Sequence, residues 1–356
     1  MKIVVAIDSF KGSLSSARAN QAVCKAASEL GFSYKAFNVA DGGEGTIDAL
    51  CSEFYEVKVL GPLGKKIKAR YGVMGNTAVI EAAQAVGLTL LSEKQRDPMN
   101  TTTYGVGEMI KDAVNRGYRK FIIGIGGSCT NDGGFGLLSA LGCRFRDKDG
   151  REIAYGAKGL KDFAAVDARG IMPEIRKCEL LIACDVDNPL CGKNGCSEVF
   201  APQKGAKEED IPLMDKWLEN YAQILGCSKD IPGAGAAGGL GYAFLYLGAI
   251  LRSGIDIVLG ELNIEEHIRK ADIVITGEGK IDNQSIRGKT PLGVARLAKK
   301  YGKKVIAFCG KCESEIEGIE SIYEINKKDT PLSVAYEKAY ENLYNTAYNI
   351  LKGINK

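Results

Sequence analysis

The chain has 356 residues, of which 45% are hydrophobic and 26% charged, a composition typical of a globular protein with room for about two domains. Its net charge of +3 is spread without a long run of one sign, which argues against nucleic acid or an anionic membrane as the main partner. The apolar start is interrupted at Asp8, too early for a signal peptide, and the uncharged, glycine-rich stretch 236–251 is short for a bilayer. We therefore expect a cytoplasmic protein whose 11 cysteines are reduced thiols.

Strand and helix patterns alternate through the first third of the chain. An unbroken apolar run at 2–7 predicts a buried strand, and a helix is expected from about Ser15 to Leu30. The next expected elements are a strand at 34–40, a helix at 46–54, hairpins within 56–81 and a helix at 104–116.

The same alternation continues to the end of the chain. Strands are expected at 120–123, 179–184, 272–276 and 304–308. Helices are expected at 137–141, 208–225, 236–251, 291–300 and 331–351. The alternation predicts an α/β fold with largely parallel sheets.

Acidic residues recur directly after the predicted strands. They are Asp8, Asp41, Glu44, Asp132, Asp185, Asp187, Glu278 and Asp282. Taken singly, each is more simply a helix cap or a loop carboxylate. Together they point to a cleft, because ligands of open α/β sheets bind beyond the carboxyl ends of the strands. They also suit Mg²⁺, which takes one or two carboxylates along with phosphates and water.

One loop is unusually rich in glycine. Residues 124–136 read GIGGSCTNDGGFG and follow the predicted strand at 120–123. Such a loop lets backbone amides approach an anion, and the helix after it would point the positive end of its dipole the same way. Asp132 would then call for a metal ion between its carboxylate and a phosphate. The simpler alternative is a strand-to-helix turn capped by Thr130, Asn131 or Asp132.

Two other stretches resemble nucleotide-binding motifs without satisfying them. Residues 288–290 (GKT) resemble the end of a P-loop, but Asn283 occupies the position of its first glycine. Residues 233–238 (GAGAAG) have the spacing of a dinucleotide fingerprint, but a polar segment with a proline precedes them where a strand should lie. A glycine-rich helix start packed against a sheet is the simpler interpretation of the second stretch.

Several short motifs follow one another along the chain. They are AIDSFKGS at 6–13, DGGEGT at 41–46, TTTYG at 101–105, GIGGSCTNDGG at 124–134, CDVDNPL at 184–190, GAGAAGGLG at 233–241, TGEGKID at 276–282 and GKTP at 288–291. In residues and order they resemble the bacterial glycerate kinases that have neither a P-loop nor protein-kinase signatures. The similarity covers nearly the whole chain, and Cys129, where alanine is expected, is a small departure.

The resemblance implies ATP-dependent phosphorylation of D-glycerate, giving a phosphoglycerate, and the acids at the strand ends suggest Mg²⁺ as cofactor. It also implies two dissimilar α/β domains, one flavodoxin-like and one restriction-enzyme-like, with the active site in the cleft between them. We expect residues 1–60 and 270–356 to form one domain and residues 61–269 the other, with soft boundaries. Whether the product is 2- or 3-phosphoglycerate stays open, with the 2-hydroxyl favoured on family grounds. The oligomeric state is open too, a homodimer being one option.

Site roles follow from the chemistry of the residues. Phosphate binding is assigned to the glycine loop through Gly126, Gly127, Ser128, Thr130, Asn131 and Asp132. Asp132 and Asp185 would reach Mg²⁺ directly or through water.

The acceptor side of the reaction is assigned to the remaining acids and lysines. Asp8 or Asp41 would orient and deprotonate the glycerate hydroxyl, with Glu44 in the same catalytic group. Lys11 would face the glycerate carboxylate or the transferring phosphoryl group. The cleft wall would be completed by Asp187, Glu278, Lys280 and Asp282.

Two other functions remain as alternatives. An NAD-dependent oxidoreductase acting on a small hydroxy acid would use residues 233–238, and it predicts nicotinamide binding unaffected by Mg²⁺. A non-catalytic sensor of a hydroxy acid predicts ligand binding without ATP consumption, and it leaves the acids at the strand ends unexplained.

Overall fold

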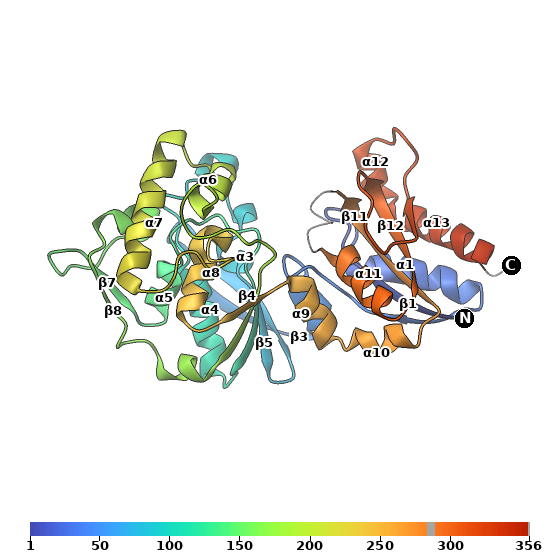
Figure 1. Ribbon diagram of the computed structural model, residues 1–356, viewed down its shortest axis with the longest axis horizontal. Helices are drawn as coiled ribbons and strands as arrows, with labels where there is room; N and C mark the ends of the chain where they lie inside the picture. The colour runs from blue at the N-terminus through green and yellow to red at the C-terminus, as the bar shows by residue number, and fades with distance from the viewer. Residues whose placement is uncertain (283–288, 355–356) are drawn as a thin grey trace. The chain divides into compact units, whose positions relative to one another are not determined.

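The computed structural model of the protein describes residues 1–282 and 289–354. The chain divides into two compact units: unit 1, Met1–Leu50 with Ser253–Lys356, and unit 2, Cys51–Arg252. Each unit has its own sheet flanked by helices, so the predicted α/β fold with parallel sheets is confirmed (Figure 1). Both ends of the chain fold into unit 1, and its middle forms unit 2.

Unit 1 is built on a five-stranded parallel sheet with the order β13-β12-β11-β1-β2. Its elements are β1 (Lys2–Ile7), α1 (Ser16–Glu29), β2 (Ser33–Ala36), α2 (Thr46–Leu50), α9 (Gly254–Glu261), α10 (Ile264–Arg269), β11 (Ile273–Ile281), α11 (Thr290–Lys300), β12 (Lys304–Cys312), β13 (Ser321–Glu324), α12 (Leu332–Glu337) and α13 (Ala339–Ile354). Counted within the unit from the β2 edge, the strand order is 2-1-3-4-5. The order of the strands therefore reverses between β1 and β11.

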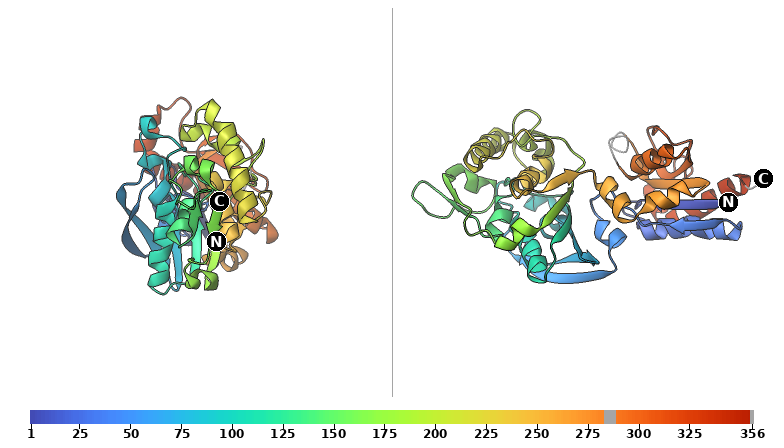
Figure 2. Two further views of the ribbon diagram at one scale, coloured as in Figure 1. Left: turned by 90° about the vertical axis from the view of Figure 1, so that its left-hand side faces the viewer. Right: turned by 60° about the horizontal axis from the view of Figure 1, so that its bottom comes forward.

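Both faces of this sheet are covered, which explains the unbroken apolar run of β1. Ile3, Val5 and Ile7 pack with α1 and α13 in one core cluster. Val4 and Ala6, which alternate with them, are buried as well. On the second face α11 packs near β11 and β12, so helices lie on both sides of the strands (Figure 2). A strand buried on both faces needs apolar residues at every position.

Unit 2 is built on a six-stranded sheet with the order β10-β9-β6-β5-β4-β3. Its strands are β3 (Glu53–Leu60), β4 (Lys66–Met74), β5 (Thr77–Glu81), β6 (Lys120–Gly124), β9 (Glu179–Ala183) and β10 (Ile250–Arg252), with a separate pair β7 (Arg144–Arg146) and β8 (Ala165–Asp167). Strands β5, β6, β9 and β10 are parallel, and β3, β4 and β5 form antiparallel pairs. The hairpins predicted within 56–81 are confirmed.

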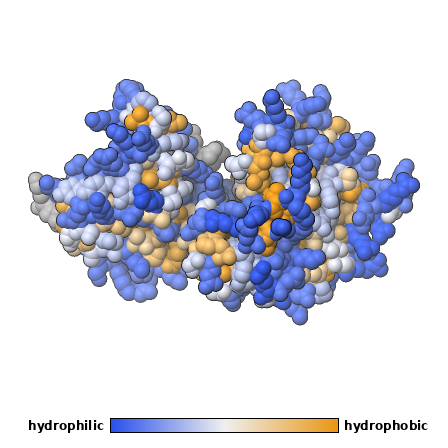
Figure 3. Space-filling view, turned by 180° about the vertical axis from the view of Figure 1, so that it is seen from behind, coloured by the Kyte–Doolittle hydropathy of each residue, from blue (hydrophilic) through white to orange (hydrophobic). Residues whose placement is uncertain are grey.

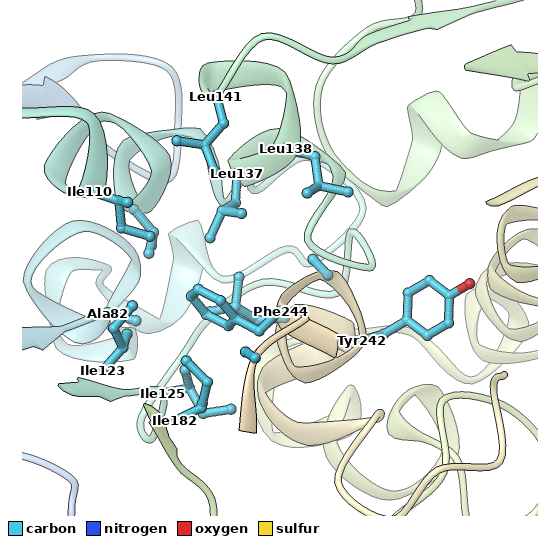
Figure 4. Packing of buried hydrophobic residues seen from close by; sticks show 14 of the residues in the cluster. Ala82, Ile110, Ile123, Ile125, Leu137, Leu138, Leu141, Ile182, Tyr242 and Phe244 are labelled. Atoms are coloured by element: carbon cyan, nitrogen blue, oxygen red, sulfur yellow. The ribbon is translucent and has the colours of Figure 1, made fainter. Parts of the chain in front are cut away.

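Helices surround the sheet of unit 2. The α-helices are α3 (Ala83–Val86), α4 (Tyr104–Asn115), α5 (Phe135–Ala140), α6 (Cys196–Phe200), α7 (Ile211–Leu225) and α8 (Ala236–Tyr246). The 3₁₀ helices are η1 (Leu88–Leu90), η2 (Glu93–Gln95), η3 (Ala157–Asp162), η4 (Pro173–Lys177), η5 (Pro202–Lys204) and η6 (Glu208–Asp210). Ile123 of β6, Leu137 of α5 and Phe244 of α8 share one apolar core (Figure 4). The core thus fixes both sides of the loop between β6 and α5.

Several predicted boundaries are wrong, and one of them matters for the site. The strand predicted at 272–276 continues to Ile281, so Glu278 and Lys280 lie on β11 rather than in a loop. The extension is held by pairing of Glu278 with Cys309 and of Lys280 with Lys311 on β12. This long-range pairing has no signal in the local sequence, which is rich in glycine and charge.

Other boundaries shift for similar reasons. The helix predicted at 46–54 ends at Leu50, and β3 begins at Glu53 because it pairs along its whole length with β4. The helix predicted at 236–251 ends at Tyr246, and residues 250–252 pair with β9. The strand predicted at 34–40 ends at Ala36. The final predicted helix is divided at Lys338 into α12 and α13.

Hydrophilic residues cover most of the face shown in Figure 3, and hydrophobic ones gather in smaller areas. Within residues 1–282 and 289–354, no helix combines the length and the apolar character that a membrane span needs. All 11 cysteines are free thiols, including Cys309 and Cys312.

Candidate functional site

Asp8 lies at the end of β1, beside the middle of β11. Asp8 follows β1 directly, and its backbone N–H donates to the carbonyl of Gly277 on β11 at 2.9 Å. These are the two strands between which the strand order reverses. In open α/β sheets, the crevice at such a reversal is the usual place for a ligand. The sheet thus places Asp8 at the preferred position for chemistry in this unit.

The carboxylate of Asp8 is buried, with 8% of the residue exposed. Its Oδ1 accepts from the backbone N–H of Ser9 and its Oδ2 from the hydroxyl of Thr290, both at 2.6 Å. The pKa of Asp8 is raised to about 6: burial contributes most to the rise and the nearby charge of Asp41 adds to it, while the hydrogen bonds from Thr290 and Ser9 and the charge of Lys11 oppose it. A carboxylate with such a pKa is ionised at neutral pH and can still accept a proton.

The loops around Asp8 are held by close backbone packing. Asp41 is half-buried, and its Oδ1 accepts from the N–H of Gly43 at 3.1 Å. A Cβ on Gly254 would lie 2.0 Å from the carbonyl oxygen of Asp41, so only glycine allows this approach. Lys11 and Glu44 are exposed. Asp41 and Lys11 both act electrostatically on the carboxylate of Asp8, so the structure places these three charged side chains near one another.

The predicted cleft-wall residues of unit 1 lie along the far end of β11. Glu278 is buried. Lys280 is exposed and forms ion pairs with Glu313 at 2.8 Å and with Asp282 at 3.7 Å. The charge of Lys280 is thus shared with two carboxylates of the same unit.

Thr290 is a site residue that the sequence analysis missed. It starts α11, is fully buried and holds the side chain of Asp8. In the sequence it belonged to the incomplete P-loop pattern, of which residues 283–288 lie outside the described part of the chain, and to the GKTP motif at 288–291, which gave it no role. The hydroxyl of Thr290 donates to a carboxylate, a role for which the P-loop pattern gives no signal.

The glycine loop of unit 2 has an exposed part, Gly126 and Gly127, which we call its crest, and a buried part that follows it. Gly126 and Gly127 are exposed, whereas every residue from Ser128 to Asp132 is buried. The loop is bonded to Val86, the last residue of α3, and to Leu88: Cys129 N–H donates to Val86 O and Leu88 N–H donates to Gly127 O, both at 2.8 Å. A loop fixed in this way presents its crest without a need to reorganise.

Asp132 lies at the bottom of the loop and is fully buried. Its carboxylate accepts from the N–H and the hydroxyl of Thr103, each at 2.9 Å, and from the N–H of Gly134 at 3.0 Å. Burial raises the pKa of Asp132, and these hydrogen bonds oppose the rise. Gly134 is the N-cap residue that precedes α5, so Asp132 fixes the turn that leads into this short helix without being its cap residue.

Lys204 is the second residue that the sequence analysis missed. It ends η5, and its ammonium group donates to the Ser128 hydroxyl at 3.1 Å and to the Thr130 carbonyl at 2.7 Å. Asn131 is held from another side, because its Nδ2 donates to Ser197 Oγ at 2.9 Å. These partners lie more than 60 residues along the chain from the loop, and local patterns cannot reveal them.

The glycines at 233–239 serve close packing against this loop. Ala237, Gly238 and Gly239 have φ values of 54°, 69° and 86°, within the left-handed region. A Cβ on Gly238 would lie 1.9 Å from the carbonyl oxygen of Thr130. Turns rather than a strand precede Gly233, so the stretch lacks the context of a dinucleotide fingerprint. The expected glycine-rich helix start is present as the start of α8, but Gly238 and Gly239 pack against the glycine loop, where the prediction had named a sheet as the packing partner.

Asp185 and Asp187 are exposed just beyond β9. Strand β9 pairs in parallel with β6, and Ala183 lies opposite Gly124, so the two loops leave the same edge of the sheet. No group of three or more His, Cys, Asp or Glu side chains suited to a metal is found within 1–282 and 289–354. The oxygens of Asp132 already accept hydrogen bonds from Thr103 and Gly134, which leaves this carboxylate little capacity to bind a metal ion directly.

Comparison with known proteins gives a consistent result over the whole chain. The chain is 44% identical to a glycerate 2-kinase of Escherichia coli, over 98% of this chain and 97% of that protein. It is also 44% identical to a glycerate kinase of Bacillus subtilis, over 95% and 94% of the two chains. The crystal structure of a putative glycerate kinase 2 from Salmonella typhimurium matches with a TM-score of 0.91 at 42% identity, over 99% of this chain and 98% of that one. The model of the glycerate kinase family matches residues 3–355, and the chain therefore belongs to the glycerate kinase family.

Proposed function

We propose that the protein transfers the γ-phosphoryl group of ATP to the 2-hydroxyl of D-glycerate. The buried carboxylate of Asp8, held by Thr290 at the strand reversal of unit 1, is the observation that carries the proposal. The names of the relatives support the substrate, and the name glycerate 2-kinase supports the 2-hydroxyl as the acceptor.

Asp8 is assigned as the general base. Its pKa of about 6 lies close to neutrality, where a base is both ionised and able to take a proton. The glycerate hydroxyl gives its proton to the carboxylate of Asp8 as its oxygen forms a bond to the γ-phosphorus. The bond from the γ-phosphorus to the bridging oxygen breaks, and ADP leaves with that electron pair.

The neighbours of Asp8 are assigned to substrate positioning. Lys11, exposed beside the acids, faces the glycerate carboxylate or the phosphoryl group. Asp41 raises the pKa of Asp8 and orients the hydroxyl, with Glu44 on the same loop. Glu278, Lys280 and Asp282 line the acceptor side in this proposal.

The donor is assigned to the glycine loop of unit 2. The exposed crest at Gly126 and Gly127 and the hydroxyl of Ser128 bind the ATP phosphates, while Thr130, Asn131 and Asp132 maintain the shape of the loop. Mg²⁺, when bound, neutralises phosphate charge. Asp185 would hold it, with Asp132 acting through the loop or a water molecule and Asp187 beside it.

The two compact units are proposed to be the two domains expected from the family. The strand order 2-1-3-4-5 of unit 1 is that of flavodoxin-like sheets and supports this assignment. Unit 2 would then be the restriction-enzyme-like domain.

A phosphorus NMR spectrum of the protein with ATP, Mg²⁺ and D-glycerate tests the function. We expect a new phosphomonoester signal, split by one proton for the 2-phosphate and by two for the 3-phosphate. ATP left intact by a folded protein would refute the kinase. Glycerate binding without ATP consumption would instead support a sensor, and Mg²⁺-independent nicotinamide binding an oxidoreductase.

A further inference from the structure

A lysine lies buried beneath the glycine loop. Only 3% of Lys204 is exposed, although lysine is almost never fully buried without a charged partner. Among the described residues, no carboxylate lies within ion-pair distance of its ammonium group. Its contacts are the neutral oxygens of Ser128 and Thr130. Burying an ammonium group costs desolvation free energy. If the side chain only filled space, an apolar residue would give a more stable protein.

The local structure brings Lys204 to this place. Pro202 begins η5, and Gly205 follows Lys204 with φ 93°. A Cβ on Gly205 would lie 2.3 Å from the carbonyl oxygen of Arg96, so the backbone around Lys204 is tightly confined. The side chain is therefore directed by its backbone toward the loop, and its position does not depend on a flexible surface segment.

The bond from Lys204 determines what Ser128 can do. Because Ser128 Oγ accepts from the ammonium, its own hydrogen must be donated elsewhere. No acceptor for that hydrogen is found in the described part of the chain. Ser128 adjoins the exposed Gly127, so an anion at the crest is a natural acceptor.

The loop has further hydrogen-bonding capacity. Thr130 Oγ1 and Asn131 Oδ1 are buried and have no partner within residues 1–282 and 289–354. Buried polar atoms are almost always hydrogen-bonded, so these atoms call for water or a ligand. The polar atoms around Lys204 thus form a site that the protein alone does not satisfy.

We propose that Lys204 is a positioning residue for nucleotide binding: it orients the Ser128 hydroxyl and places a positive charge beneath the loop crest that binds ATP phosphates. This inference rests on the assignment of the donor to the glycine loop. Residues 124–136 contain no lysine or arginine, and Asp132 is acidic, so the loop itself supplies no positive charge for phosphate binding. Lys204 would supply that charge.

Lys204 should change its protonation state within a pH range that can be used in binding experiments. Burial lowers the pKa of Lys204 to about 8, opposed by the groups that face it: Cys196, Cys129 and Asp132. Burial also raises the pKa values of Cys129 and Cys196 to about 12, so these thiols stay neutral there. A bound triphosphate favours the ammonium form, and ATP binding near pH 8.5 should take up a proton.

Calorimetric titration of the full chain with ATP and Mg²⁺, without glycerate, measures this uptake in buffers of different ionisation enthalpy. We expect the wild type to take up roughly half a proton or more at pH 8.5 and much less at pH 6.5. Lys204→Met should lose the uptake and bind ATP at least about tenfold more weakly, with a smaller effect on AMP. Lys207→Met, which removes an exposed lysine three residues away, is the matched control and should behave as wild type.

Ser128→Ala keeps the proposal testable if Lys204→Met fails to fold. It should weaken ATP binding, and in a double variant its effect should not add to that of Lys204→Met. Absent proton uptake by the wild type, or ATP affinity unchanged in Ser128→Ala, would overturn the role of Lys204. If either result is found while the wild type still forms phosphoglycerate, only the role of Lys204 is refuted. If the wild type forms no phosphoglycerate, the proposed kinase activity is refuted.

Discussion

The acid cluster of unit 1 and the glycine loop of unit 2 each place a buried ionisable group beside exposed residues, and these two groups, Asp8 and Lys204, have opposite sign. Asp8 is a buried carboxylate near the exposed Lys11, and Lys204 is a buried ammonium beneath the exposed Gly126 and Gly127. Burial moves both pKa values toward neutrality, upward to about 6 for Asp8 and downward to about 8 for Lys204. In the proposed mechanism the exposed residues of each region would contact the substrates, while the buried group would set the local charge and proton-transfer capacity.

Replacing Asp8 should have the largest effect on activity, because it removes the buried ionisable group of unit 1. Asp8→Asn keeps the shape but removes the base, so we expect kcat to fall by about 10²–10⁴-fold. Steady-state assays with D-glycerate and ATP measure it. Asp149→Asn, an exposed acid of unit 2, is the control and should leave kcat unchanged. A loss of less than about tenfold in Asp8→Asn would remove Asp8 from the role of base.

Replacing Gly238 should give the next largest effect and tests the loop side. In Gly238→Ala the new Cβ meets the Thr130 carbonyl in a left-handed backbone. We expect a loss of about 1–3 kcal/mol in the free energy of unfolding. We also expect the KM for ATP to rise roughly tenfold or more, because the loop is displaced.

The control for Gly238 is Gly260, which lies in α9 with no atom within 4 Å of its would-be Cβ. Gly260→Ala should be neutral or more stable by up to about 1 kcal/mol. Denaturant unfolding and ATP kinetics on both variants separate a packing effect from a generic glycine effect. Equal KM values for ATP in the two variants would contradict the link between residues 233–239 and the loop.

Asp8→Asn should also stabilise the fold. The pKa of Asp8 is raised from its ordinary value to about 6, so the folded state favours the protonated form and stability falls as pH rises from about 4 to 6. Removing the charge should increase the free energy of unfolding by about 1–3 kcal/mol at pH 8, with little change near pH 4. Urea unfolding at both pH values measures this. A variant less stable than wild type at pH 8 would show that the charged form of Asp8 is well tolerated.

Replacing Thr290 should have the smallest effect on activity, and it tests whether this residue sets the pKa of Asp8. Thr290→Val removes the hydrogen bond that favours ionised Asp8, so the pKa of Asp8 should rise by about 1 unit. The acid limb of kcat/KM should move upward by the same amount, with activity at pH 8 changed only a few-fold. Thr276→Val removes an equally buried hydroxyl that donates to Ala6 O at 2.9 Å, and its pH profile should match wild type. Identical shifts in both variants would point to a general packing effect.

Much of the fold and the outline of the site could be predicted from local sequence. The apolar run of β1, the start of α1 near Ser15 and the hairpins within 56–81 depend on neighbouring residues, and they were predicted. The extension of β11 through Glu278 and Lys280 was not, because it depends on pairing with β12, which lies some 30 residues further along the chain. Strand ends that are set by a distant partner have no local periodicity to reveal them.

The sequence by itself determined the family, the α/β alternation and the positions of acids and glycines after strands, because these are properties of short motifs and of their order. The tertiary structure decided which of these residues are buried and what holds them. Thr290 reaches Asp8 across 282 positions, and Lys204 reaches Ser128 across 76. Since desolvation and hydrogen bonding set the pKa values of Asp8 and Lys204, their chemistry depends on contacts that only folding creates.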